Sequence, residues 1–228
     1  MIPASFYHPI FLYLILVLTF ISCSKVSSLG FNRINRNNDS IIPAFLLCMI
    51  LAVFIGVRPL SGMYFGDTAN YAYSYNFMKS GMVMPHDDGE WIWGHFMYFC
   101  AQRMDVTLFF TIVDLGYFGC TLWASRRLAK GNVWIMVLFN LAAFSFFTYG
   151  TNGIRNGFAC SLVLVALSYA TTNKRGLIIA CALAFLAINI HRTTSLPFLM
   201  SLVSLFFIKS FKWAYTFWII SIIVSLVA

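Results

Sequence analysis

The stretch VTLFFTIVDLGYFGCTLWASRR (residues 106–127) decides what kind of protein this chain is. It is apolar for most of its length, with Asp114 as the one charged residue before it ends in two arginines. In a helix, about 20 such residues reach roughly 30 Å, which is the thickness of the hydrocarbon core of a bilayer. We therefore expect a membrane-spanning helix here.

The remainder of the chain repeats this pattern. Of its 228 residues, 61% are hydrophobic and only 10% are charged, whereas a soluble domain has about 25% charged residues. Mean hydropathy is +0.82. The other apolar runs are 7–23, 41–57, 133–149, 157–172, 176–190, 195–208 and 213–228. This composition predicts an all-α, polytopic integral membrane bundle of about eight transmembrane helices, forming a single domain over residues 1–228.

The two ends of the chain carry separate expectations. Lys25, the first basic residue, follows the first apolar run, so we interpret that run as an uncleaved span that enters with its N-terminus outside. A cleaved signal ending at Cys23 is the alternative. The last run reaches Ala228 without a polar flank. Either that helix ends at the bilayer surface or the chain is a fragment of a longer protein.

The net charge of +8 is better explained by topology than by nucleic-acid binding, because the basic residues separate apolar runs. Sorted by alternating sides, one group is Lys25, Arg33, Arg36, Arg126, Arg127, Lys130, Lys174, Arg175, Lys209 and Lys212. The smaller group is Arg58, Lys79, Arg103, Arg155 and Arg192. The positive-inside rule makes the side of the larger group cytoplasmic.

The opposite, outer side holds the more varied chemistry. Its titratable residues include His8, His86, His95, His191, Asp67, Asp87, Asp88, Glu90 and Asp105. Most of them lie in one long outer loop, residues 58–105, and such loops are usually functional. Its segment GEWIWGHFMYFCAQRM predicts an interfacial helix, although an ordinary aromatic belt also explains the tryptophans. No two of the six cysteines form a CxxC motif, so neither a disulfide framework nor a metal site is indicated.

Three arginines assigned to the outer side, Arg58, Arg155 and Arg192, lie at the ends of predicted spans. The positive-inside rule does not explain basic residues on that side. For any one of them, interfacial anchoring is the simplest explanation. Arg155, however, lies in YGTNGIRNG, whose glycines permit a tight turn and close approach to a ligand, and Arg192 lies in HRTT. If these two and Arg58 converge, they form a clamp for phosphate or pyrophosphate through bidentate bonds. We therefore expect a lipid pyrophosphate to bind here.

The order of three motifs resembles the EpsG-like polysaccharide polymerases, within the Wzy-type exopolysaccharide and O-antigen polymerases. These motifs are GDTANYAYSY (residues 66–75), GIRNGFA (153–159) and NIHRTT (189–194), and the resemblance runs from about Arg58 to Thr194. Asn156 stands where such proteins commonly have glutamine. The chain is also shorter than typical members, and missing C-terminal spans would leave it inactive.

The resemblance implies a metal-independent glycosyltransferase without a cofactor, on the outer face of a bacterial inner membrane. It would join polyprenyl-pyrophosphate-linked oligosaccharide repeats in exopolysaccharide, capsule or O-antigen synthesis, with other polysaccharide assembly proteins as partners. Arg155 and Arg192, supported by Arg58, would stabilise the departing pyrophosphate.

Four further residues are weighed against plainer alternatives. Asp67 and His191 are the candidate general bases, although Asp67 also suits a turn cap and His191 a helix end. Tyr71 and Tyr75 share a helix face, where they would contact sugar rings or only pack. A fifth residue, Asp114, lies within its span, where an acid is a candidate functional residue, but a helix–helix hydrogen bond to Asn140 is the favoured explanation.

Proteins of two other classes would also place polar groups in a membrane bundle. A lipid-linked oligosaccharide flippase or transporter should show internal repeats and charges near the midplane, and the sequence shows neither pattern. A membrane acyltransferase would use a histidine-centred pair, which His191 could supply, but has less need of the arginines. A structural subunit of a complex is the remaining alternative.

Overall fold

The computed structural model describes residues 2–29, 41–82, 89–129, 131–170, 174–207, 215–216 and 219–220. The elements are α1 (Ala4–Leu29), α3 (Ile41–Gly56), α4 (Gly66–Lys79), α5 (Trp91–Ala101), α6 (Val106–Leu128), α7 (Val133–Leu141), α8 (Phe146–Thr151), α9 (Ile154–Ala170), α10 (Lys174–Ile190), the 3-10 turn η2 (Arg192–Thr194) and α11 (Ser195–Phe207). No strand occurs in these ranges, so the all-α class is confirmed. Outside them lie Arg33, Arg36, His86, Asp87, Asp88, Lys130, Lys209, Lys212 and most of the run 213–228.

The expected number of spans is not met. Among the described residues, two helices are long and apolar enough to cross a bilayer, Ala4–Lys25 within α1 and Val106–Leu128, and the latter is the span expected from the opening stretch. The apolar helices α3 and α9 have only 16 and 17 residues. The run 133–149 is not one helix, because its backbone leaves the helical path between α7 and α8. The prediction of about eight spans is therefore corrected to two clear spans and several shorter apolar helices.

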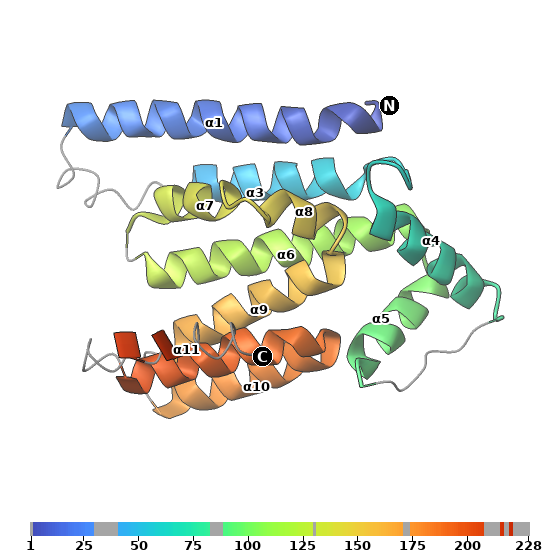
Figure 1. Ribbon diagram of the computed structural model, residues 1–228. Helices are drawn as coiled ribbons and strands as arrows, with labels where there is room; N and C mark the ends of the chain where they lie inside the picture. Colours follow the sequence, from blue (N-terminus) through green and yellow to red (C-terminus); the bar gives the residue numbers. More distant parts are fainter. Residues whose placement is uncertain are drawn as a thin grey trace.

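Helix α6 lies at the centre of the bundle (Figure 1). On one side it packs against α3, and on the other against α9, which in turn packs against α10. The contact with α3 requires a glycine, since a Cβ on Gly56 would lie 2.5 Å from the Cα of Thr111. Both core clusters include α6: Phe109 and Phe110 belong to one, and Tyr117 and Phe118 belong to the other.

The described parts of the long predicted loop, residues 58–82 and 89–105, lie at one end of the bundle, which we call the loop end (Figure 1). It carries two helices, α4 and α5, and the predicted aromatic helix is α5. An interfacial aromatic belt does not account for both tryptophans of α5, because Trp93 is 4% exposed and packs against Phe109 of α6. Trp91, by contrast, is 44% exposed. Helix α5 is thus docked on the bundle, and its start lies next to the end of α10.

Candidate functional site

Four residues meet around one carboxylate at the loop end. Oε1 of Glu90 lies 2.9 Å from Nδ1 of His191 and accepts a hydrogen bond from the backbone N–H of Arg192 at the same distance. Oε2 of Glu90 lies 2.5 Å from Nη1 of Arg155. We call Glu90, Arg155, His191 and Arg192 the Glu90 cluster. It joins Glu90 to Arg155 and to two residues that are 101 and 102 positions away in the sequence.

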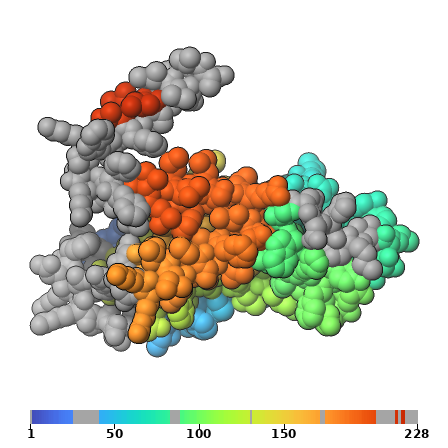
Figure 2. Space-filling view, turned by 90° about the horizontal axis from the view of Figure 1, so that it is seen from below, coloured from blue at the N-terminus to red at the C-terminus, as the bar shows by residue number. Residues whose placement is uncertain are grey.

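The surrounding helices explain why these side chains meet. Glu90 directly precedes α5, and its carbonyl accepts the N–H groups of Trp93 and Gly94 in the first turn of that helix. Arg155 lies in the first turn of α9. His191 follows α10 in an extended conformation (φ −152°, ψ 113°), which turns the chain into η2. The surface of α10 runs up to that of α5 at the loop end (Figure 2).

Gly89 allows Arg192 to lie against the loop backbone. Its φ of +83° is in the left-handed region that favours glycine. A Cβ at this position would overlap the guanidinium of Arg192, whose Nε also faces the Gly89 carbonyl oxygen at 3.4 Å. Position 89 therefore favours glycine for two reasons, namely its positive φ and the nearby Arg192 side chain.

The Glu90 cluster is partly open and carries excess positive charge. The side chains of Arg155, Glu90 and His191 are 31%, 20% and 17% exposed, and Arg192 is exposed. Two guanidinium groups against one carboxylate leave a net positive charge. Within the described part of the chain, Nε of Arg155 and Oδ1 of Asn152 are buried atoms without a hydrogen-bond partner. An unsatisfied donor beside an exposed cation favours an anionic ligand.

Of the predicted site residues on α4, Tyr71 lies near the Glu90 cluster. Tyr71 is half-buried, with its ring 5.9 Å from that of Trp93 in an edge-on contact. Burial raises the pKa of the Tyr71 hydroxyl; the charge of Arg155 opposes this rise, while Asp67 and Glu90 add to it. Tyr71 is therefore within electrostatic range of all three. Asp67 is exposed in the first turn of α4.

Arg58 is not part of this group, contrary to the sequence-based prediction. Its guanidinium is enclosed: Nη1 donates to Asp114 and to the Ile55 carbonyl, and Nη2 donates to Thr68 and to the Thr151 carbonyl. With both terminal nitrogens occupied and the residue 2% exposed, Arg58 has no free face for a pyrophosphate. It holds helices together instead.

The Asp114 interaction is also corrected. Its ion-pair partner is Arg58, and the expected bond to Asn140 is absent. The Asn140 amide donates to Ser125 Oγ and to the Met136 carbonyl instead. Asp114 therefore has a structural partner, but one that comes from the end of α3.

Tyr75 does not lie where it could contact a sugar. The residue is fully buried, its ring packs 5.1 Å from that of Phe109, and its hydroxyl donates to the Met104 carbonyl at 3.1 Å. Tyr71 and Tyr75 lie one turn apart on α4, but the helix rests on α6 through Tyr75 and leaves Tyr71 closer to the Glu90 cluster. Of the two predicted sugar contacts, only Tyr71 keeps a suitable position.

The glycines around Arg155 serve helix packing. None of Gly150, Gly153 and Gly157 has a positive φ. A Cβ on Gly157 would lie 2.7 Å from the Tyr149 carbonyl oxygen, so this glycine lets α8 and α9 approach each other. The expected tight turn is present as well, because only Asn152 and Gly153 separate α8 from α9, and it places Arg155 in the first turn of α9.

Glu90 is the residue that the sequence interpretation did not single out. It was noted only as one of several outer acids. A usable signal was present, since it follows a glycine and directly precedes an aromatic helix on the side that carries the unexplained arginines. An acid on that side is expected to pair with the arginines.

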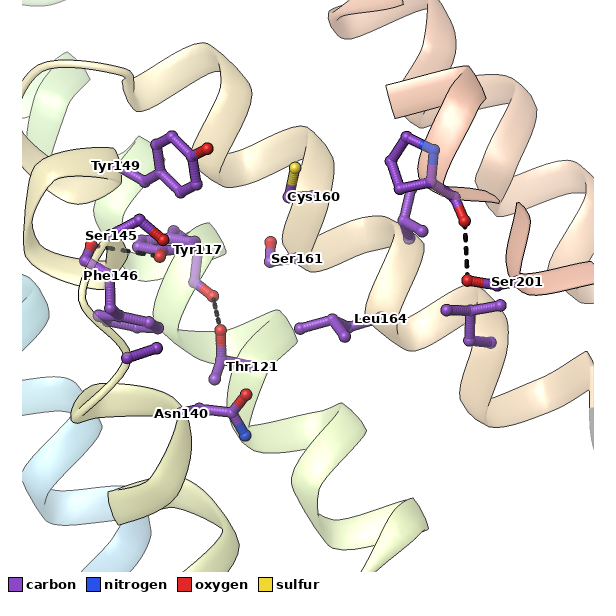
Figure 3. Close-up of a pocket in the computed structure, with 14 residues that line it drawn as sticks. Tyr117, Thr121, Asn140, Ser145, Phe146, Tyr149, Cys160, Ser161, Leu164 and Ser201 are labelled. Atoms are coloured by element: carbon purple, nitrogen blue, oxygen red, sulfur yellow. Dashed lines mark hydrogen bonds between the residues drawn. The ribbon is translucent and has the colours of Figure 1, made fainter. Parts of the chain in front are cut away.

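Away from the Glu90 cluster, a hollow of about 320 Å³ lies between α6, α7, α8, α9 and α11. Figure 3 shows Tyr117, Thr121 and Asn140 on one side of it and Ser201 of α11 on the other. The break between α7 and α8 borders this hollow at Ser145. None of the predicted site residues lines it. Among the described residues, no group of three or more metal-ligating side chains occurs.

These features define a class: a bundle of apolar helices whose folded loop end carries a cationic site. A sequence profile of the EpsG family matches residues 41–228, and the chain belongs to that family. The family and the apolar helices together indicate a membrane protein with a role in exopolysaccharide biosynthesis. No curated protein and no solved structure matches the chain.

Proposed function

We propose that this protein is a polymerase that joins polyprenyl-pyrophosphate-linked oligosaccharide repeats on the outer face of a bacterial inner membrane. The observation that carries the proposal is the convergence of Arg155, His191 and Arg192, from two distant segments, in one partly open cluster. Family membership supports the exopolysaccharide role. In this proposal the loop end faces outward, as the distribution of basic residues predicts.

The reaction would transfer a glycosyl group with loss of pyrophosphate. An acceptor hydroxyl oxygen forms a bond to the anomeric carbon while the bond from that carbon to the pyrophosphate oxygen breaks. The electron pair of the broken bond stays on the pyrophosphate, whose growing charge is stabilised by Arg155 and Arg192. The Arg155 side chain is 31% exposed, so part of it is accessible to the substrate for this purpose.

The proton of the acceptor hydroxyl needs a base. His191 is our first candidate because its ring lies in the Glu90 cluster next to the arginines. Asp67 is the second, since it is exposed on the same end of the bundle. Tyr71 would contact the sugar from α4. We leave Arg58 and Tyr75 out of the proposed site because both are enclosed.

The test is complementation of a polymerase-deficient strain, scored as a ladder of polymer against single repeats. We expect Arg155→Ala and Arg192→Ala to abolish the ladder at normal protein level. Arg103→Ala is the matched control: it is also an arginine of the group assigned to the outer side, but its guanidinium stacks on Phe99 at 3.8 Å and bonds that residue's carbonyl. Equal loss in the control, or a normal ladder in both variants, would contradict the proposal.

A second candidate is a membrane acyltransferase, because His191 is paired with a carboxylate, as a histidine base often is. The two functions differ in their need for the arginines. An acyltransferase would keep most of its activity in Arg155→Ala and would acylate single repeats without lengthening them. Mass spectrometry of the lipid-linked products distinguishes the two outcomes.

A further inference from the structure

We propose that Glu90 is a positioning residue that sets the protonation pattern of His191 and holds Arg155 beside it. The catalytic role of Glu90 rests on the proposed function, but the contacts that Glu90 makes do not depend on the substrate. It concerns a residue that motif comparison did not select, and it assigns a separate task to each of the two carboxylate oxygens.

The contacts of Oε1 determine which ring nitrogen of His191 carries hydrogen. The Glu90 carboxylate contacts two groups that can only donate hydrogen bonds, the Arg155 guanidinium and the Arg192 backbone N–H. An ionised carboxylate can only accept hydrogen bonds. The 2.9 Å contact therefore requires the hydrogen on Nδ1 of His191. In the neutral ring this leaves a lone pair on Nε2, which becomes the proton-accepting atom.

The contact of Oε2 has a different effect. It pairs with Nη1 of Arg155 and so ties the start of α9 to the start of α5. Through Oε1 the same side chain holds the turn after α10. Because one short side chain joins three segments, the distance between the candidate base and the candidate phosphate ligand is fixed by Glu90 and not by either residue alone.

Substitutions can separate the two tasks. In Glu90→Gln, the amide oxygen can still accept from His191 and Arg192, but the amide nitrogen meets Arg155 as donor against donor. In Glu90→Leu, all of these contacts are lost in a side chain of similar size. Asp105→Asn is the matched control: this acid belongs to the same loop and caps α6 through Leu108 N–H, a role that asparagine also fills.

The first measurement is ¹⁵N NMR of histidine-labelled protein in lipid nanodiscs, at a pH where the rings are neutral. The His191 signals are assigned from the spectrum of His191→Asn. We expect Nδ1–H in wild type, in Glu90→Gln and in Asp105→Asn, and a change of tautomer in Glu90→Leu. Nε2–H in the wild type, or an unchanged tautomer in Glu90→Leu, would overturn the proposal.

The second measurement is the rate of polymer formation in proteoliposomes. We expect kcat to fall about 100-fold in Glu90→Leu, as for loss of a working base. In Glu90→Gln, KM for the lipid-linked donor should rise about tenfold with a smaller change in kcat. If wild type forms no polymer, the proposed function fails while the NMR result still decides the tautomer. If wild type polymerises and both Glu90 variants match it, the positioning role is wrong.

Discussion

Arg58 and Asp114 form an ion pair in the interior of the bundle: Nη1 lies 3.0 Å from Oδ2, and their side chains are 0% and 1% exposed. The same guanidinium donates to the Thr68 hydroxyl and to the Thr151 carbonyl. One side chain thus connects the end of α3 with α4, α6 and α8. This connection explains how the loop end is held to the bundle, next to the segment that carries Arg155.

Removal of one member of this pair should destabilise the protein strongly. A buried charge left without its partner costs about 3–5 kcal/mol. We expect Arg58→Ala and Asp114→Ala to lower the midpoint of thermal unfolding in detergent by many degrees, or to prevent accumulation of the folded protein. Arg103→Ala, at an exposed arginine, is the control and should unfold as wild type does. An unchanged midpoint in Arg58→Ala would show that this ion pair contributes little.

The sequence was informative about helices and about which residues share an end of the bundle. Long apolar runs and the order of basic residues are local patterns, so the span at 106–128 and the grouping of Arg155 with His191 and Arg192 could be predicted. The pairing of Arg58 could not, because it depends on a carboxylate 56 residues away and on a backbone carbonyl 93 residues away. The break between α7 and α8 was also missed, since its residues are as apolar as their neighbours.

Gly89 should be required for the geometry of the Glu90 cluster. Gly89→Ala combines an unfavourable positive φ with an overlap on the Arg192 guanidinium. Gly81→Ala provides the control, because Gly81 has a similar φ of +75° but no atom within 4 Å of an added Cβ. Both substitutions place alanine at a positive φ, which costs of order 1 kcal/mol of stability in each variant. Only Gly89→Ala should reduce polymer formation, by at least tenfold. Equal activity of the two variants would mean that the position of Arg192 does not matter.

Replacement by alanine should lower the free energy of unfolding at Gly157 and raise it at Gly119. A Cβ on Gly157 meets the Tyr149 backbone, so Gly157→Ala must push α8 away from α9 and should cost about 1–3 kcal/mol. Gly119 lies in α6 with nothing within 4 Å of its added Cβ. Gly119→Ala should therefore stabilise its helix by up to about 1 kcal/mol. Thermal unfolding in detergent measures both, and a stabilising Gly157→Ala would contradict the close approach of the two helices.

Replacing each of these two tyrosines by phenylalanine should affect different properties: polymer formation at Tyr71 and stability at Tyr75. Tyr71→Phe removes a hydroxyl near the Glu90 cluster, and we expect polymer formation to fall about tenfold with little change in unfolding, which matches the loss of one hydrogen bond to substrate. Tyr75→Phe removes the shorter of two hydrogen bonds to the Met104 carbonyl, leaving the one from Lys79 Nζ at 3.5 Å, and should cost about 1 kcal/mol of stability at normal activity.

The Tyr75 prediction also has a pH signature. Burial raises the pKa of Tyr75 to about 12, above the ordinary value of 10.0. The contribution of the neutral hydroxyl is therefore fully present below pH 10 and is lost as pH rises toward 12. The stability difference between wild type and Tyr75→Phe, measured by denaturant unfolding in detergent, should shrink across that interval. A stability difference that stays constant with pH would contradict the burial of the Tyr75 hydroxyl. A loss of activity in Tyr75→Phe at neutral pH would return Tyr75 to the list of substrate contacts.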